Sequence, residues 1–322
     1  MKRFALLGLL FLSTWFVTPT AQAQSCSLGA PSVSFPAFNP LTGTALTTVG
    51  TVQVSCTWPF LNLVPNVKIC VNFSAASPRS LANGSNTIAY DMYIDGGYAT
   101  PWGSTPTGAL STTLSNSILG GSASAYINIY SRIAANQTTV PTTGNSSTVY
   151  STTYPAGNVT LTYQFYLLSP PACSPTGFSN GTTLGFTASM TVTNDCTINA
   201  TGITFAPSTT LRNTLSAQGS LAVQCTNNDA YQILLSGGNS GQVGARTLKG
   251  QTLGATIPYQ LYLDAAYATA WGDGTGGTST YLGTGTGTGM ATSIPIYGRI
   301  LAQPSTPAPD TYQDSITATI QF

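Results

Sequence analysis

The clearest pattern in this chain is a regular alternation of apolar and polar residues. At the carboxyl end, Ile316, Ala318, Ile320 and Phe322 are each separated by one polar residue. Side chains of an extended strand point alternately to the two faces of a sheet, so this spacing predicts a strand with one buried face. Comparable signals in the second half of the chain predict strands near 196–205, 219–225, 230–236, 257–264, 292–300 and 313–322. The pattern predicts an all-β protein.

The same strand pattern occurs twice along the chain. A segment at 91–95 with the following Trp102 returns at 260–264 with Trp271, and the Ile-Tyr-x-Arg-Ile sequence at 129–133 returns at 296–300. A chain of 322 residues is long enough for two domains of ordinary size. Many short strands separated by polar turns favour immunoglobulin-like β-sandwiches, so we expect two such domains in tandem.

One strand-like segment lies between the two copies, and nothing like it precedes the first or follows the second. Its alternate apolar residues are Leu184, Phe186, Ala188, Met190 and Val192. The last predicted strand of the first copy carries Val159, Leu161, Tyr163 and Phe165. An immunoglobulin-like sandwich needs one more strand beside it, so we expect 183–193 to fold back antiparallel and act as an internal donor strand. The alternative is that 183–193 is simply the first strand of the second domain.

The second copy has no such segment, so its last strand, with Ile316, Ala318, Ile320 and Phe322, is expected to be an open acceptor edge. An apolar groove beside an unpaired edge aggregates unless another chain adds a strand to it. We therefore expect the second domain to lack its final strand and to receive one from a partner by donor-strand complementation. The predicted boundaries are 24–180 for the first domain, 181–194 for the donor strand and linker, and 195–322 for the second domain.

Residues 1–23 have the composition of a Sec signal peptide. The basic residues Lys2 and Arg3 precede a mostly apolar stretch at 4–17, and the small residues around 21–23 fit a cleavage site. No later stretch reaches the roughly 20 continuous apolar residues that a membrane span needs. We expect export to the periplasm and a mature chain that begins near Gln24.

Charge and cysteine content narrow the possible chemistry. Nine basic and eight acidic residues, with no His, leave no basic patch for nucleic acid. The cysteines follow the repeat, so the expected disulfides are Cys26 with Cys56, Cys196 with Cys225 and, from the remaining two, Cys70 with Cys173. Export makes disulfides the default state. With no His and no close Cys pair, we expect no metal site.

Catalysis has few candidate groups in this sequence. The chain contains no His or Glu for proton transfer, and the expected disulfides leave no Cys as a nucleophile. The acids near aromatic residues are Asp91, Asp95, Asp264 and Asp273. We expect them in solvated turns rather than in a carboxylate pair for glycoside hydrolysis. The sequence therefore predicts no enzyme activity, no catalytic residues and no cofactor.

Three connections of the first domain are expected to share the end that points away from the second domain, as loops do in antibody domains. The candidate adhesive residues in them are Trp58, Phe60, Leu61, Leu63, Val64, Leu114, Ile118, Leu168 and Phe178. We predict exposed hydrophobic fingers, because a large exposed apolar patch marks an interaction site. Two alternatives remain: these side chains plug the end of the core, or they line a closed sugar pocket in which Trp58 stacks on the ring.

Several motifs in this chain, some of them present in both copies, occur in a fixed order. They are the Thr-Asn-Asp-Cys-Thr-Ile sequence at 193–198, the strands at 91–95 and 260–264 with their Trp-Gly pairs, the Ile-Tyr-x-Arg-Ile strands, and the aromatic carboxyl end at Phe322. Together they resemble the spore coat protein U domain, the subunit fold of archaic, Csu-type chaperone–usher pili. The resemblance covers nearly the whole mature chain, once in each copy.

The resemblance implies a role at the end of a fibre. An ordinary subunit of that family carries its donor strand before its first Cys, whereas here only Gln24 and Ser25 precede Cys26. A subunit that accepts a strand but donates none is expected to be a tip adhesin that attaches to surfaces and supports biofilm formation. The implied partners are a periplasmic pilus chaperone, an outer-membrane usher, an adjacent pilin subunit and an abiotic or host surface. The alternatives are a shaft or minor subunit of a pilus or coat, and a carbohydrate-binding, lectin-like tip.

Overall fold

The computed structural model describes residues 24–322 apart from positions 227 and 229, so the expected signal peptide at 1–23 lies outside the described residues. Regular structure in the described part consists of strands and two short 3-10 helices, η1 (Pro40–Thr42) and η2 (Gly238–Ser240). None of the described helices is long and apolar enough to cross a membrane. The prediction of an all-β fold is confirmed.

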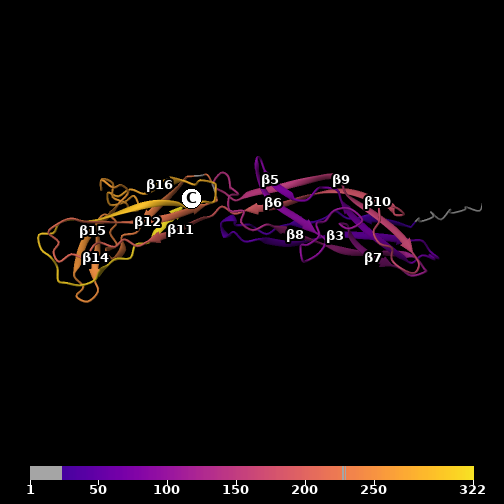
Figure 1. The fold of residues 1–322 in the computed structure, drawn as a ribbon, viewed down its shortest axis with the longest axis horizontal. Helices are drawn as coiled ribbons and strands as arrows, with labels where there is room; N and C mark the ends of the chain where they lie inside the picture. The colour runs from indigo at the N-terminus through magenta and orange to yellow at the C-terminus, as the bar shows by residue number, and fades with distance from the viewer. Residues whose placement is uncertain (1–23, 227, 229) are drawn as a thin grey trace, which may run out of the picture.

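Figure 1 shows an elongated molecule in which two β-rich units lie end to end. The first unit, here called the first domain, comprises β1 (Ser25–Leu28), β2 (Val33–Ser34), β3 (Leu46–Trp58), β4 (Asn66–Phe73), β5 (Arg79–Asn83), β6 (Asn86–Tyr93), β7 (Leu110–Ser115), β8 (Gly121–Ile133), β9 (Thr148–Tyr166) and β10 (Ser179–Val192). The second domain comprises β11 (Cys196–Thr201), β12 (Leu215–Cys225), β13 (Ala230–Leu235), β14 (Arg246–Gly250), β15 (Thr256–Tyr262), β16 (Tyr281–Thr284), β17 (Thr292–Ile300), β18 (Tyr312–Gln313) and β19 (Ala318–Gln321).

The first domain is a continuous sheet that encloses its own core. The strand order is β1-β3-β8-β6-β5-β9-β10-β2, and β4 pairs with both β9 and β7. The inward face of β3 carries Val52, Val54, Cys56 and Trp58, which are all buried, whereas the residues between them are half-buried. Alternation along each strand therefore supplies one apolar face to the interior.

β10 lies within the sheet of the first domain. It pairs antiparallel with β9, where Leu184 is opposite Val159, and on its other side it pairs in parallel with β2. Its inward side chains Phe186, Ala188, Met190 and Val192 are buried in the first core. β10 thus packs with the first domain and does not begin the sheet of the second.

The second domain repeats this plan with two separate sheets, β11-β12-β17-β15-β14-β18 and β16-β13-β19. The same central contact occurs inside each of the two domains. In the first domain the indole Nε1 of Trp102 donates to the carbonyl oxygen of Val71 at 2.9 Å, and in the second Trp271 donates to Ile233 at 3.0 Å. Both indoles are fully buried, so this contact aligns β4 with β13.

Two strand predictions are wrong in their extent. The predicted strand over 313–322 is interrupted, because β18 pairs with β14 in one sheet and β19 pairs with β13 in the other. The predicted strand over 196–205 ends at Thr201. In the first domain the corresponding stretches pair with β10 on its two sides. Extended backbone becomes a strand only when it has a hydrogen-bonded neighbour, and the described residues of the second domain form no equivalent of β10.

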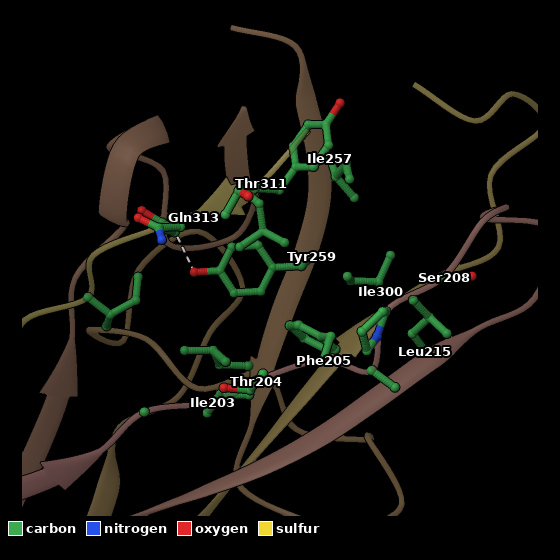
Figure 2. Close-up of a pocket in the computed structure, with 18 of the residues that line it drawn as sticks. Ile203, Thr204, Phe205, Ser208, Leu215, Ile257, Tyr259, Ile300, Thr311 and Gln313 are labelled. Carbon is green, nitrogen blue, oxygen red and sulfur yellow. Dashed lines mark hydrogen bonds between the residues drawn. The ribbon is translucent and has the colours of Figure 1, made fainter. Parts of the chain in front are cut away.

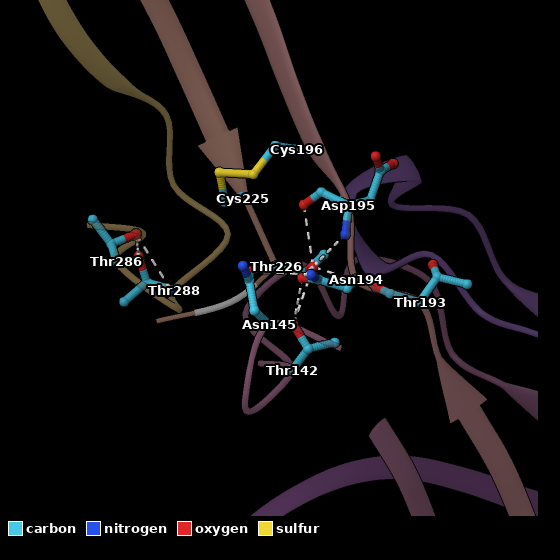
Figure 3. Close-up of a disulfide and its surroundings, with 10 residues drawn as sticks. All are labelled: Thr142, Asn145, Thr193, Asn194, Asp195, Cys196, Cys225, Thr226, Thr286 and Thr288. Carbon is cyan, nitrogen blue, oxygen red and sulfur yellow. Dashed lines mark hydrogen bonds between the residues drawn. A yellow bond between two sulfur atoms is a disulfide. The ribbon is translucent and has the colours of Figure 1, made fainter. Parts of the chain in front are cut away.

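The junction between the domains is short and hydrogen-bonded. Residues 193–195 connect β10 to β11, and Figure 3 shows Thr226 beside them, next to the Cys196–Cys225 disulfide. The backbone N–H of Thr226 donates to the carbonyl oxygen of Asp195 at 3.0 Å, and the backbone N–H of Asp195 donates to the Thr226 hydroxyl at 2.9 Å. The side chain of Thr226 therefore accepts a hydrogen bond from the linker backbone where the linker enters the second domain.

Candidate functional site: an open groove and an apolar tip

The second domain contains a long open groove with a volume of about 1220 Å³. One wall is formed by 200–209 and the other by 306–314, and the floor between them is apolar. The floor residues include Leu215, Leu221, Leu235, Leu248, Ile257, Tyr259, Leu261, Ile296 and Ile300. Figure 2 shows Phe205, Tyr259 and Ile300 around this space.

In the first domain the equivalent space is filled by β10. Ile203 and Phe205 correspond in the repeat to Val33 and Phe35, and Val33 belongs to the strand that pairs in parallel with β10. In the second domain residues 203–205 form no strand and line the groove instead. The groove therefore has the position expected for a missing strand.

The strand at the far side of the groove is exposed along one edge. β19 pairs with β13, and within the described residues no strand pairs with its other edge. The predicted acceptor residues Ile316, Ala318 and Ile320 are only half-buried against the second core, and Phe322 is 39% exposed. Their counterparts Val159 and Leu161 in the first domain are completely buried beneath β10.

Two polar side chains, Tyr259 in the groove and its strand neighbour Arg246, are engaged in hydrogen bonds. The hydroxyl of Tyr259 donates to Oδ2 of Asp314 at 2.6 Å, and burial, followed by this hydrogen bond, raises the pKa of Tyr259 well above its ordinary value. Arg246 is fully buried and donates from Nε to the carbonyl oxygen of Ser236 at 2.9 Å, and burial lowers its pKa. A neutral phenol and a satisfied guanidinium stabilise the domain, and the remaining apolar surface is suited to binding.

Three loops meet at the opposite end of the molecule, beyond the carboxyl end of β9. The backbone N–H of Asn62 donates to Ile118 at 3.0 Å, and that of Asn116 donates to Pro65 at 2.9 Å. The side chain of Asn66 donates to the carbonyl oxygen of Leu167 at 3.2 Å. β9 spans 19 residues and begins opposite Val192 at the domain junction, so this end is on the order of 50 Å from the second domain.

This end exposes a cluster of large apolar side chains, which we call the apolar tip. Its members are Phe60, Leu61, Leu63, Ile118, Leu119, Leu167 and Leu168, with exposures from 54% to 91%. Leu61 has a φ of 61°, a left-handed conformation that is unusual for a bulky residue. An exposed Leu in a costly backbone conformation indicates that the surrounding loops fix its position.

Sequence reasoning missed the residue that organises the tip. Asn62 is 4% exposed. Its Oδ1 accepts from the backbone N–H of Val64 at 3.0 Å and from Nε2 of Gln24 at 2.5 Å, and its Nδ2 donates to the carbonyl oxygen of Val64 at 3.0 Å. Gly120 has a φ of 76°, and a Cβ there would lie 2.3 Å from the carbonyl oxygen of Pro59. The sequence offered two signals: an Asn within an apolar run, and a Gly in the loop that faces it.

Several predicted adhesive residues are not exposed. Trp58 is 1% exposed and packs edge-to-face on Phe165, with ring centroids 5.7 Å apart, because β3 continues past Cys56 and its alternation directs Trp58 inward. Leu114 lies on β7 and packs against the first core. Val64 and Phe178 are half-buried. The exposed apolar side chains at this end are therefore those of the apolar tip, whereas Trp58 is part of the core and is not placed to stack on a sugar ring.

The three disulfides join the pairs expected from the repeat: Cys26–Cys56, Cys70–Cys173 and Cys196–Cys225. Two of them connect neighbouring strands at the edge of a sheet. Cys26–Cys56 joins β1 to β3 in the first domain, and Cys196–Cys225 joins β11 to β12 in the second. The third connects β4 to the loop that follows Leu168, across 103 residues of sequence. It restrains one of the three loops of the apolar tip.

The acidic residues have structural surroundings. Asp95 and Asp264 accept backbone N–H groups in equivalent turns, as expected. Asp91 is an exception to the expected solvated turn, since it is buried and forms an ion pair with Arg79. The prediction for Asp91 failed because Arg79 comes from the neighbouring strand β5, which the sequence pattern did not reveal.

Two tandem β-sandwiches, one closed by its own strand and one open, define the class of protein. The Spore Coat Protein U domain model matches residues 12–153 and 182–319, which is most of the chain in two copies. The protein therefore belongs to the spore coat protein U domain family, as the sequence motifs predicted.

Several known proteins are similar to this chain. Protein U of Myxococcus xanthus is 29% identical over 114 residues, and the match spans 34% of this chain and 61% of that protein. The CsuC–CsuE chaperone–tip adhesion subunit pre-assembly complex of archaic Csu pili from Acinetobacter baumannii has the same fold, with a TM-score of 0.50, 17% identity and coverage of 92% of this chain and 100% of that one. The CupB6 tip adhesin of Pseudomonas aeruginosa gives a TM-score of 0.35 at 11% identity, covering 92% of this chain and 94% of that one.

Proposed function

We propose that this protein is the tip adhesin subunit of a chaperone–usher pilus. Its second domain is joined to the fibre by a strand from an adjacent pilin subunit, and its apolar tip contacts a surface. One observation carries the proposal: the first domain holds its own strand β10, whereas the second leaves the equivalent groove open.

The energetics of strand addition support a partner for the groove. A strand added to a sheet edge gains main-chain hydrogen bonds, and its alternate side chains enter apolar pockets. Burial of five side chains like those of β10 contributes on the order of 8–12 kcal/mol before the cost of ordering, and this is an upper bound. An open apolar groove of this length in a secreted protein would otherwise promote aggregation.

The apolar tip supports adhesion without a specific ligand. Leu168 is 91% exposed and Leu63 is 76% exposed, whereas the core side chains of this domain are buried. The loops that carry them are held together by hydrogen bonds, so they lose little conformational entropy on contact. Such a surface binds by removing apolar area from water, at about 25 cal/mol for each Å².

The proposal includes a route to the cell surface. The chain would be exported by a Sec signal peptide, bound in the periplasm by a pilus chaperone, and passed through an outer-membrane usher to the end of the fibre. Three disulfides are suited to an oxidising compartment. Attachment through the tip would then support biofilm formation on abiotic or host surfaces.

Attachment of piliated cells tests the proposal. The Phe60→Ser, Leu63→Ser and Leu168→Ser triple variant should attach poorly to a hydrophobic surface while secretion and fibre number stay unchanged. The matched control is Leu253→Ser, Leu282→Ser and Leu301→Ser, which removes exposed apolar side chains of the second domain and should attach normally. Equal attachment by the two variants would refute adhesion through the apolar tip.

The position of the protein on the fibre separates the tip proposal from its alternatives. Gold-labelled antibody should mark fibre ends, whereas label along the fibre would indicate a shaft or coat subunit. Soluble saccharides should leave attachment unchanged, and competition by one of them would indicate a lectin-like tip.

A further inference from the structure

We infer that the groove of the second domain selects a donor strand with an aromatic side chain at one inward position and Ala or Gly at the next inward position. This inference rests on the proposed function that the groove receives a strand from a neighbouring subunit. It comes from a comparison of the two domains, because β10 shows how a strand of this fold fills the equivalent groove.

The aromatic position corresponds to Phe186 of β10. The Phe186 ring lies 5.7 Å from that of Phe73, 5.1 Å from that of Tyr154 and 6.2 Å from that of Trp102, measured between centroids. Phe186 is buried, so these three aromatic side chains form its pocket in the first domain.

Two of the three pocket residues are smaller in the second domain. The shared tryptophan contact aligns β4 with β13, so Leu235 takes the place of Phe73. Arg79 is opposite Tyr90 and Arg246 is opposite Tyr259, so β5 corresponds to β14. In this register Ser151 is opposite Ala82 in the first domain, and Gln313 is opposite the equivalent Lys249 in the second. Ile316, three residues after Gln313, therefore stands where Tyr154, three residues after Ser151, stands in the first domain.

The resulting pocket is wider than its counterpart, and both replacement residues line the groove. The buried indole of Trp271 remains beside it, as Trp102 does in the first domain. A small donor side chain would leave a cavity there, and unfilled cavities weaken packing in proportion to their volume. The donor strand thus needs Phe, Tyr or Trp at this position.

The small position corresponds to Ala188. Ala188 is completely buried and pairs in parallel with Val33, so their side chains share one face of the sheet. In the second domain Ile203 replaces Val33 and adds a methylene group to the same wall, where it lines the groove (Figure 2). A larger donor residue would overpack this site.

The direction of the donor strand follows from the same comparison. β10 is antiparallel to β9 and parallel to β2. A donor strand in the same direction would run antiparallel to β19 and parallel to 203–205, with the aromatic position near Ile316 and the small position near Ile203. The order along the donor from amino to carboxyl end is therefore aromatic residue, outward residue, small residue.

Binding of three peptides to the full chain tests this inference. The first copies residues 183–193, Thr-Leu-Gly-Phe-Thr-Ala-Ser-Met-Thr-Val-Thr. The second exchanges its Phe and Ala, which preserves composition, and the third has Ala in place of Phe. The first should raise the melting temperature of the full chain, and the other two should bind more than about tenfold more weakly by fluorescence anisotropy.

The outcomes separate this inference from the proposed function. Equal binding of the first two peptides would overturn the selection rule and leave strand acceptance intact. No binding by any of the three would overturn both. A photoreactive phenylalanine at the aromatic position of the first peptide should form adducts with groove residues such as Leu235, and adducts confined to the apolar tip would overturn the inference.

Discussion

The backbone N–H of Thr142 in the first domain donates a 2.7 Å hydrogen bond to the carbonyl oxygen of Thr226 in the second domain. Both residues are buried, and their hydroxyl oxygens lie 3.4 Å apart. Nearby, Nδ2 of Asn39 in the first domain donates to the Asp195 carboxylate at 2.5 Å. The domains are therefore joined by buried hydrogen bonds as well as by the chain, which restricts the angle between them.

Replacing Thr226 with Val should loosen this junction. Val preserves the shape of the side chain but removes a hydroxyl that bonds to the linker, and leaving buried polar groups unpaired costs about 1–3 kcal/mol. Spin-label distances between the two domains should broaden, and the melting temperature should fall. Thr288→Val, at an exposed position, is the control. An unchanged distance distribution in Thr226→Val would show that the junction does not depend on this hydroxyl.

Replacing Asn62 with Ala should disorder the apolar tip. Asn62 is buried and satisfies the backbone of Val64 as well as the side chain of Gln24. Hydrogen exchange should accelerate at 59–65 and 116–120, whereas the strands of the first core should keep their protection. The matched control is Asn128→Ala on the exposed face of β8. Equal protection in Asn62→Ala and the native chain would contradict the role of Asn62.

Replacing Phe186 with Ala should destabilise the first domain by about 3–5 kcal/mol, because it leaves a cavity among three aromatic side chains. Denaturant unfolding followed by fluorescence would measure the change. Thr187→Ala, on the exposed face of the same strand, should change the unfolding free energy by less than about 0.5 kcal/mol. Similar values for the two variants would mean that β10 does not close the first domain.

Stability should fall in acid because two equivalent turns depend on carboxylates. Backbone N–H groups of Ala268 and Thr269 lower the pKa of Asp264, and those of Thr100 and Ala99 lower that of Asp95. A lowered folded-state pKa gives stability that is present above the unfolded-state pKa and is lost as pH falls through the folded value.

The free energy of unfolding should therefore decrease below about pH 3.9, the ordinary Asp value. The Asp95→Asn and Asp264→Asn double variant should show a smaller decrease between pH 7 and pH 2 in urea unfolding. An identical decrease would exclude these two turns as the source.

Much of the fold was available from local patterns. Alternation predicted the strands near 219–225 and 292–300, and the repeated cysteine positions predicted two of the three disulfides. The same kind of alternation located the segment from Leu184 to Val192. These features depend on residues that are close in sequence, where a period of two is enough to assign a face.

The burial of Trp58 and the role of Asn62 were not available from such patterns. Trp58 is buried because β3 continues beyond Cys56, and its ring rests on Phe165, which is distant in sequence. Asn62 is buried because its own loop meets the loop that contains Ile118, and these two loops are far apart in the sequence. A local pattern contains no information about which distant segment will cover a side chain.

By itself, the sequence determined that this is a duplicated, disulfide-linked β protein with one strand-like segment between the copies. Only the tertiary structure decided which side chains remain at the tip and how wide the groove of the second domain is. Strand alternation specifies the face of each residue, but exposure and pocket size are set by neighbours that the folded chain brings together from far apart.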